Sequence, residues 1–121
     1  MSKLEDLVPP LKLCRMIPAG KFNDSALVWG EDYALNKVIQ RCWNSFLNNE
    51  PITLYYKGIP APTLAEIMDA DHRIHIARSY NDKTWVADCW VNGKWIARNA
   101  ITPATAALRL WLEVNGVEVE K

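Results

Sequence analysis

The sequence lacks the features that mark several large classes of protein. Its apolar runs fall far short of the roughly 20 residues that span a bilayer. The opening residues 1–6, Met-Ser-Lys-Leu-Glu-Asp, are too acidic and too poor in apolar side chains for a secretory signal. We therefore expect a cytoplasmic protein with no membrane partner.

Cysteine, histidine and glycine are scarce. The three cysteines, Cys14, Cys42 and Cys89, are an odd number at wide spacing, which indicates neither a disulfide framework nor a zinc knuckle. None of them has a base close by in the sequence, so we expect three buried, unreactive thiols. The chain also contains no Gly-rich phosphate loop and no Gly-x-Ser-x-Gly motif. We therefore expect no catalytic residue, no cofactor and no metal.

An excess of charge of either sign is also lacking. Fourteen basic side chains balance 14 acidic ones, which argues against a protein whose main task is to grip phosphate backbones. Aromatic surface, in contrast, is abundant, with six tryptophans, four tyrosines and two phenylalanines. A chain of 121 residues that is 50% hydrophobic predicts one folded domain, residues 1–121, rather than a disordered tail or a two-domain enzyme.

The first half of the chain gives mixed signals. Prolines flank a short apolar run at 11–17, which suits one or two helical turns. Residues 24–30 form a strand or a buried segment, and residues 51–56 are typical of a strand. Between them, the helical spacing of apolar residues predicts a helix over 32–47. The apolar residues of that spacing are Leu35, Val38, Ile39, Cys42, Trp43 and Phe46.

The second half is better specified. Thr63 and Glu66 form a capping box that begins a helix over 63–70. Asn92-Gly93 lies between two alternating runs, which is a strong hairpin signal. The sequence therefore predicts an α+β fold. Its core, residues 60–117, is a three-stranded antiparallel sheet with two helices on one face. The predicted strands are 73–80, 84–91 and 94–100, and the helices are 63–70 and 103–115.

The hairpin register places Trp90 opposite Trp95, on the sheet face that points away from the helices. We expect the N-terminal segment, residues 1–59, to cover this face, because small monomers seldom expose a large apolar patch. If the face is open instead, the two indoles can anchor a partner. The binding residues of that alternative are Trp90, Trp95, His75, Arg73, Lys83 and Lys94.

Alternation along the strands points Arg78 and Arg98 toward the core face, so each must lie at its rim or pair with an acid.

Three segments resemble a group of small uncharacterised proteins of phages and prophages of gut bacteria. They are Ile17–Trp29, Pro60–Met68 and Thr102–Glu113. The resemblance rests on capping and packing motifs. It implies a phage or prophage origin and an accessory role, and it brings no established activity.

The α-β-β-β-α order is also similar to the double-stranded RNA-binding domain, with the match in Val86–Leu112. RNA-binding members of that family place several lysines at the start of the final helix. This chain has Thr102–Ala106 there, without a basic residue, which weakens the RNA inference.

Three hypotheses follow. The leading one is a non-catalytic binding module with an unknown protein partner. The first alternative is a nucleic-acid binder that uses Arg73, Arg78, Lys83, Lys94 and Arg98. The second is an enzyme or metal protein built on His75 and Asp88, which has little support because His72 and His75 would lie on opposite faces of a strand and could not share one ion. The oligomeric state is left open.

Overall fold

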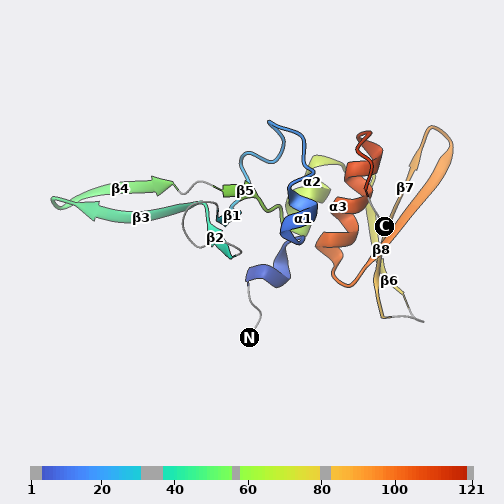
Figure 1. Ribbon diagram of the computed structural model, residues 1–121, viewed down its shortest axis with the longest axis horizontal. Coiled ribbons are helices and arrows are strands. Elements are labelled where there is room, and N and C mark those ends of the chain that lie inside the picture. Colours follow the sequence, from blue (N-terminus) through green and yellow to red (C-terminus); the bar gives the residue numbers. More distant parts are fainter. Residues whose placement is uncertain (1–3, 31–36, 56–57, 80–82, 120–121) are drawn as a thin grey trace.

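The computed structural model describes residues 4–30, 37–55, 58–79 and 83–119 (Figure 1). Their mixed content of helices and antiparallel sheets confirms the predicted α+β class. The helices are η1 (Leu4–Leu7, a 3-10 helix), α1 (Leu11–Cys14), α2 (Leu64–Ala70) and α3 (Pro103–Val114). The strands are β1 (Leu27–Gly30), β2 (Val38–Gln40), β3 (Cys42–Leu47), β4 (Glu50–Tyr55), β5 (Gly58–Pro60), β6 (His75–Arg78), β7 (Trp85–Val91) and β8 (Lys94–Ala100). No helix in these ranges is long and apolar enough to cross a membrane.

The α-β-β-β-α order of the second half is confirmed. Strands β6, β7 and β8 form an antiparallel sheet in that order, and Trp90 pairs with Trp95 as the sequence predicts. The turn residues Asn92 and Gly93 have positive φ angles of 51° and 80°, the conformation that a two-residue hairpin requires. Helix α3 packs on β7 and β8, and α2 packs on α3, so both helices lie on one side of the sheet (Figure 1).

The predicted helix over 32–47 is wrong. Its first part, 32–36, lies outside the described residues, and most of the rest forms β2 and β3. Strand β3 pairs antiparallel with β4 along its whole length. Asn48 and Asn49 make the turn between them, with φ angles of 51° and 66° that asparagine adopts more readily than most residues. Because of this turn, the strand predicted at 51–56 has β3 as a partner for its backbone hydrogen bonds. A helix over 32–47 would have left that strand without this partner.

Helix α3 is buried around most of its circumference. Leu108 and Leu112 lie one turn apart on one face of the helix, whereas Leu110 points to the opposite side, and all three are fully buried. The second covering layer comes from the N-terminal part of the chain: α1 contacts α3, and the Phe22 ring meets Trp111 edge-on with ring centroids 4.8 Å apart. One continuous core therefore joins both halves of the chain around α3.

The molecule is elongated, with its layers arranged along the long axis (Figure 1). The sheet β6–β7–β8 lies at one end, followed by α2 and α3, and then by α1 and a small antiparallel sheet of order β2-β1-β5. In that sheet, Gly58 leaves room for the neighbouring strand, because a Cβ atom there would come within 2.4 Å of the Trp29 carbonyl oxygen. The hairpin β3–β4 projects beyond the small sheet and forms the other end.

Glu66 links the two halves of the chain. Its Oε1 accepts hydrogen bonds from the backbone N–H of Thr63, at 2.9 Å, and from the Thr63 hydroxyl, while its Oε2 accepts one from the backbone N–H of Ala26, at 3.0 Å. The Thr63 hydroxyl accepts in turn from the Glu66 N–H, which confirms the predicted capping box. One carboxylate thus caps α2 and holds the residue that precedes β1.

We expect Glu66→Ala to lower the free energy of unfolding by about 1–3 kcal/mol, because it removes a helix cap and a tie between the two halves. Glu66→Gln should retain part of this stability, since its amide oxygen still accepts. Urea unfolding followed by far-UV circular dichroism measures both effects. Glu118→Ala, at an exposed position, is the control. A loss for Glu66→Ala no larger than for Glu118→Ala would show that the carboxylate does not hold the halves together.

Candidate interaction surface

The far face of the β6–β7–β8 sheet is open. Trp90 and Trp95, neighbours in the strand register, expose 66% and 56% of their surface. The expectation that residues 1–59 cover this face is wrong. Among the described N-terminal residues, α1 and Phe22 pack against α3 instead.

Successive side chains of a strand point to opposite faces of the sheet, so strand alternation determines which side chains lie on this far face. On β7, Ala87 and Cys89 point toward the helices and are buried, so their neighbours point away. We call the outward set the tryptophan face. Its members are His75, Ala77, Val86, Asp88, Trp90, Trp95, Ala97 and Asn99. Val86 and Ala97 are half-buried, so a floor of small apolar side chains continues from the two indoles, and the face as a whole is mainly apolar.

His75 and Asp88 meet across β6 and β7 on the tryptophan face, next to Trp90. Their strands pair in register, and His75 Nδ1 lies 3.6 Å from Asp88 Oδ1. The residues that flank Asp88 on this face are Val86, Trp90 and Ala97, none of which can act as a nucleophile. No group of three or more His, Cys, Asp or Glu side chains that could hold a metal occurs among the described residues. The pair therefore adds polarity to the tryptophan face beside Trp90.

The basic residues of the predicted site are not brought together. Arg73 donates to both carboxylate oxygens of Asp71, from Nε at 3.0 Å and from Nη2 at 2.8 Å. These hydrogen bonds lower the pKa of the Asp71 carboxyl. Lys83 and Lys94 are both exposed, but Lys83 precedes β7 and Lys94 follows its far end, so a whole strand separates them. Lys94 also pairs with Val91, which packs against the core, so strand alternation places Lys94 on the helix side of the sheet. The described residues therefore form no continuous basic track beside the indoles.

The two remaining arginines of the nucleic-acid hypothesis lie on the helix side of the sheet. Arg98 forms an ion pair with Glu113 of α3. The Arg78 guanidinium lies 5.5 Å from the centroid of the Trp85 ring, within the range of a cation–π contact. Alternation along the strands thus predicts their side correctly, and Arg98 has the acidic partner that its position demands.

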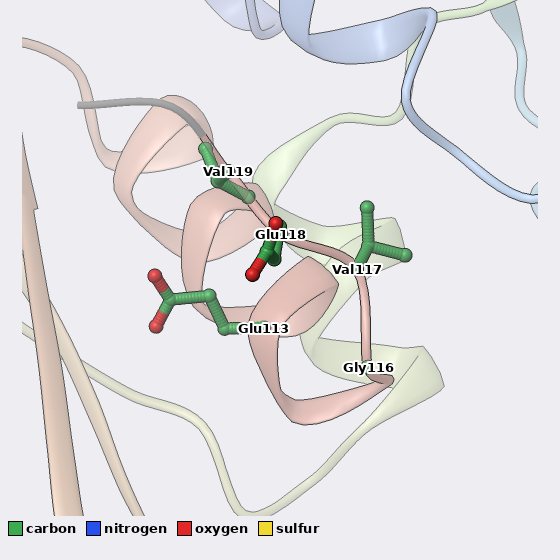
Figure 2. Close-up of a pocket in the computed structure, with 5 residues that line it drawn as sticks. All are labelled: Glu113, Gly116, Val117, Glu118 and Val119. Carbon is green, nitrogen blue, oxygen red and sulfur yellow. The ribbon is translucent and has the colours of Figure 1, made fainter.

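A hollow lies at the C-terminal end of α3 (Figure 2). Its lining consists of two carboxylates, two valines and a glycine: Glu113, Gly116, Val117, Glu118 and Val119. Glu113 is already paired with Arg98. Among the described residues, its lining holds no histidine, cysteine, serine or lysine.

The expectation of three buried thiols is wrong for Cys42. Cys14 and Cys89 are buried, whereas Cys42 is exposed on β3. Burial raises the pKa of Cys14 to about 12 and also raises the pKa of Cys89. Cys42 was assigned to the apolar stripe of a helix that does not form, which explains the error.

We expect a thiol reagent at pH 8 to label one cysteine of the native protein, Cys42, because the other two thiols are buried and protonated. Quantification by intact mass should give a single adduct, rising to three in denaturant. Cys42→Ser should abolish the native adduct, and Cys14→Ser serves as the matched control. Rapid native labelling at Cys14 would contradict the burial of α1 against the core.

Tryptophan fluorescence with an aqueous quencher tests the open face directly. Trp90 and Trp95 are exposed, whereas Trp29 and Trp111 are only 8% and 5% exposed. We therefore expect Trp90→Phe and Trp95→Phe each to remove a strongly quenched component of the emission. Trp29→Phe should leave the quenched component unchanged. A quenched fraction that is insensitive to both face substitutions would mean that the sheet face is covered in solution.

Sequence reasoning missed a second exposed apolar surface, at the tip of the β3–β4 hairpin. Phe46 and Leu47 expose 74% and 61% of their surface. The available signal was Asn48-Asn49, a pair of turn-forming residues between two runs that can both form strands.

Comparison of the chain with protein-family models, with curated proteins and with solved structures finds no match. The resemblances to phage proteins and to the RNA-binding domain therefore stay predictions.

Proposed function

We propose that this protein is a non-catalytic interaction module that binds a protein partner through the tryptophan face. One observation carries the proposal: two adjacent indoles, each more than half exposed, stand side by side on the outer face of a hydrogen-bonded sheet. Tryptophan is enriched among the residues that dominate protein interfaces, and its rigid ring loses little conformational entropy on binding. An accessory role of the phage or prophage type belongs to the same proposal.

A protein partner fits the surroundings of the indoles better than a nucleic acid does. Binding of single strands combines stacking on aromatic rings with a positive groove along the backbone. Here Arg73 is engaged by Asp71, and Lys83 lies at the opposite end of the strand from Lys94. The apolar floor of Val86 and Ala97 instead suits the apolar core of a protein–protein interface.

Site-specific photo-crosslinking tests the proposal. A photoreactive residue at position 97, on the tryptophan face, is compared with one at position 65, an exposed alanine on α2. We expect a protein adduct from position 97 and none from position 65. The double substitution Trp90→Ala/Trp95→Ala should abolish the adduct from position 97. Adducts with nucleic acid, or protein adducts of equal yield from both positions, would overturn the proposal.

A further inference from the structure

Strand β3 has an open edge. It pairs with β4 on one side, and among the described residues no strand lies along its other side (Figure 1). An isolated hairpin of two strands is marginally stable in water, and three or more strands are needed for an independently stable sheet. The open edge of β3 is therefore a place where a further strand would stabilise this part of the chain.

The register of the hairpin determines which backbone groups face outward. Leu47 and Glu50 flank a two-residue turn, so they exchange backbone hydrogen bonds with each other. Hydrogen-bonded pairs alternate along an antiparallel ladder with pairs whose N–H and C=O groups point away from the partner strand. Phe46 and Pro51 are the next pair, so they direct their backbone groups outward, each from its own edge of the hairpin.

Pro51 closes one of these two edges. Proline has no N–H, which costs the hairpin nothing at an outward position but removes a donor from the outer edge of β4. On β3, Asn44 and Phe46 both have outward N–H and C=O groups, because Asn44 pairs with Thr53 two residues further along the same alternation. The hairpin can therefore accept a further strand at β3, whereas the outer edge of β4 lacks a donor.

Strand β3 also differs from the other edge strands of the described chain in having no protection. Natural proteins block exposed edges with charged side chains, with proline or with very short strands. Strand β8 carries Lys94 and Arg98, β4 carries Pro51, and β2, β5 and β6 span only three or four residues. Strand β3 spans six residues, Cys42–Leu47, without a charged residue or a proline. Such an edge is a template for pairing with another chain.

We propose that β3 pairs antiparallel with β3 of a second copy of this chain, and that the two hairpins together form one four-stranded sheet of order β4-β3-β3-β4. The pairing is centred on Asn44, which lies opposite Asn44 of the other copy, so that the outward groups of both strands meet. The tryptophan face lies at the other end of the molecule (Figure 1). A dimer of this kind therefore leaves that face free for its own partner.

A second copy suits this edge better than an arbitrary strand does. Strand β3 contains no charged side chain, so two identical strands place no like charges opposite each other. The Thr53 hydroxyl donates to Asn44 Oδ1 at 3.2 Å, and this carbonyl oxygen has a second lone pair. Since Asn44 is exposed, its amide nitrogen can donate to Oδ1 of the other copy's Asn44 and receive the same bond in return.

The contact is symmetric, so it is complete with two copies. Both copies use the same edge, which is the isologous arrangement of a two-fold dimer. The outer edges of the new sheet belong to β4, where Pro51 lacks the N–H that further pairing needs. We therefore expect dimers and no larger species.

A matched pair of proline variants tests which edge is used. Asn44→Pro removes an outward N–H from β3, and Thr53→Pro removes one from β4, directly opposite. Both substitutions leave the backbone hydrogen bonds within the hairpin in place, and both remove the side-chain hydrogen bond between the two residues. In sedimentation velocity, at a concentration at which the unaltered protein is mainly dimeric, Asn44→Pro should be monomeric and Thr53→Pro should remain dimeric. Circular dichroism of each variant verifies that it is folded.

Disulfide formation provides a second test, which also decides the matter if Asn44→Pro does not fold. Asn44→Cys and Thr53→Cys are each introduced into a Cys42→Ser background, in which the remaining cysteines are buried. At the centre of the proposed contact the two Cα atoms lie about 5.5 Å apart, the spacing of a hydrogen-bonded pair, which a disulfide can bridge. The two copies of position 53 are three strand spacings apart, about 14 Å, which is too far for a disulfide. Mild oxidation should therefore give a covalent dimer from position 44 and none from position 53.

Several results would overturn the proposed pairing. In sedimentation, they are an unaltered protein that stays monomeric at every concentration, species larger than dimers, and a folded Asn44→Pro variant that dimerises like the unaltered protein. A folded Thr53→Pro variant that is monomeric would also overturn it, because β4 would then be the paired edge. In the oxidation test, the contrary result is a covalent dimer that is absent at position 44 or equally frequent at position 53.

Discussion

Leu110→Ala is expected to remove a large part of the stability of this protein. The Leu110 side chain is fully buried, and truncation of such a leucine costs about 2–5 kcal/mol through lost apolar contact and the cavity that remains. A domain of this size has a free energy of unfolding of roughly 5–15 kcal/mol. The variant should therefore unfold at a much lower urea concentration, with a steep loss of helical signal.

The place of Leu110 in the fold explains why its loss should affect the whole chain. Helix α3 lies between the β6–β7–β8 sheet and the N-terminal layer, and the buried side chains on it contact one continuous core. A cavity beside α3 therefore loosens both layers at once. The two halves of the chain should therefore unfold at the same urea concentration, as in a two-state transition.

Leu7→Ala is the matched control, because Leu7 is 48% exposed in η1 and loses the same atoms. We expect it to change the free energy of unfolding by less than about 1 kcal/mol, as surface substitutions usually do. Equal losses for Leu7→Ala and Leu110→Ala would show that α3 is not the shared centre of the core.

Trp90→Ala/Trp95→Ala is expected to have the opposite outcome, with loss of binding and retention of the fold. Interface tryptophans of this kind each contribute about 2 kcal/mol or more to binding, which corresponds to about 30-fold in affinity at 1.4 kcal/mol per tenfold change. Their cross-strand contact contributes only about 0.2–1 kcal/mol to the stability of the sheet. Few other contacts are lost, since both side chains are more than half exposed.

Affinity for the protein that crosslinks at position 97 and urea stability of the free protein should be measured on the same variants. Ile101→Ala, at a position that is 84% exposed, is the control and should change neither quantity. A Trp90/Trp95 variant that unfolds as readily as Leu110→Ala would mean that the two indoles belong to a core. Unchanged affinity in a stable variant would remove the tryptophan face from the binding site.

The second half of the fold was predictable because its signals are local. The capping box joins Thr63 to Glu66, three residues apart, and the turn at Asn92-Gly93 fixes the register of its two strands. Thr102 caps α3 and Pro103 occupies its first turn, as their residue types indicate. Each of these interactions is complete within a few residues, so no knowledge of the rest of the chain is needed.

The hairpin β3–β4 was not predictable from periodicity alone. Val38, Ile39, Cys42 and Phe46 fit a helical stripe in the sequence, yet they lie on strands. The apolar spacing does not distinguish the two structures in so short a segment. The outcome depends on pairing with residues 50–55, which supply the backbone partners of β3, and on the tolerance of two asparagines for positive φ.

The sequence by itself determined the α+β class, the α-β-β-β-α order and the pairing of Trp90 with Trp95, because capping, turn formation and strand alternation act over a few residues. Only the tertiary structure decided which apolar surface the N-terminal part covers. Helix α3 and the far face of the sheet both offered apolar area, and α1 and Phe22 pack against α3. That choice depends on contacts between residues far apart in the chain, and it leaves Trp90 and Trp95 open to solvent.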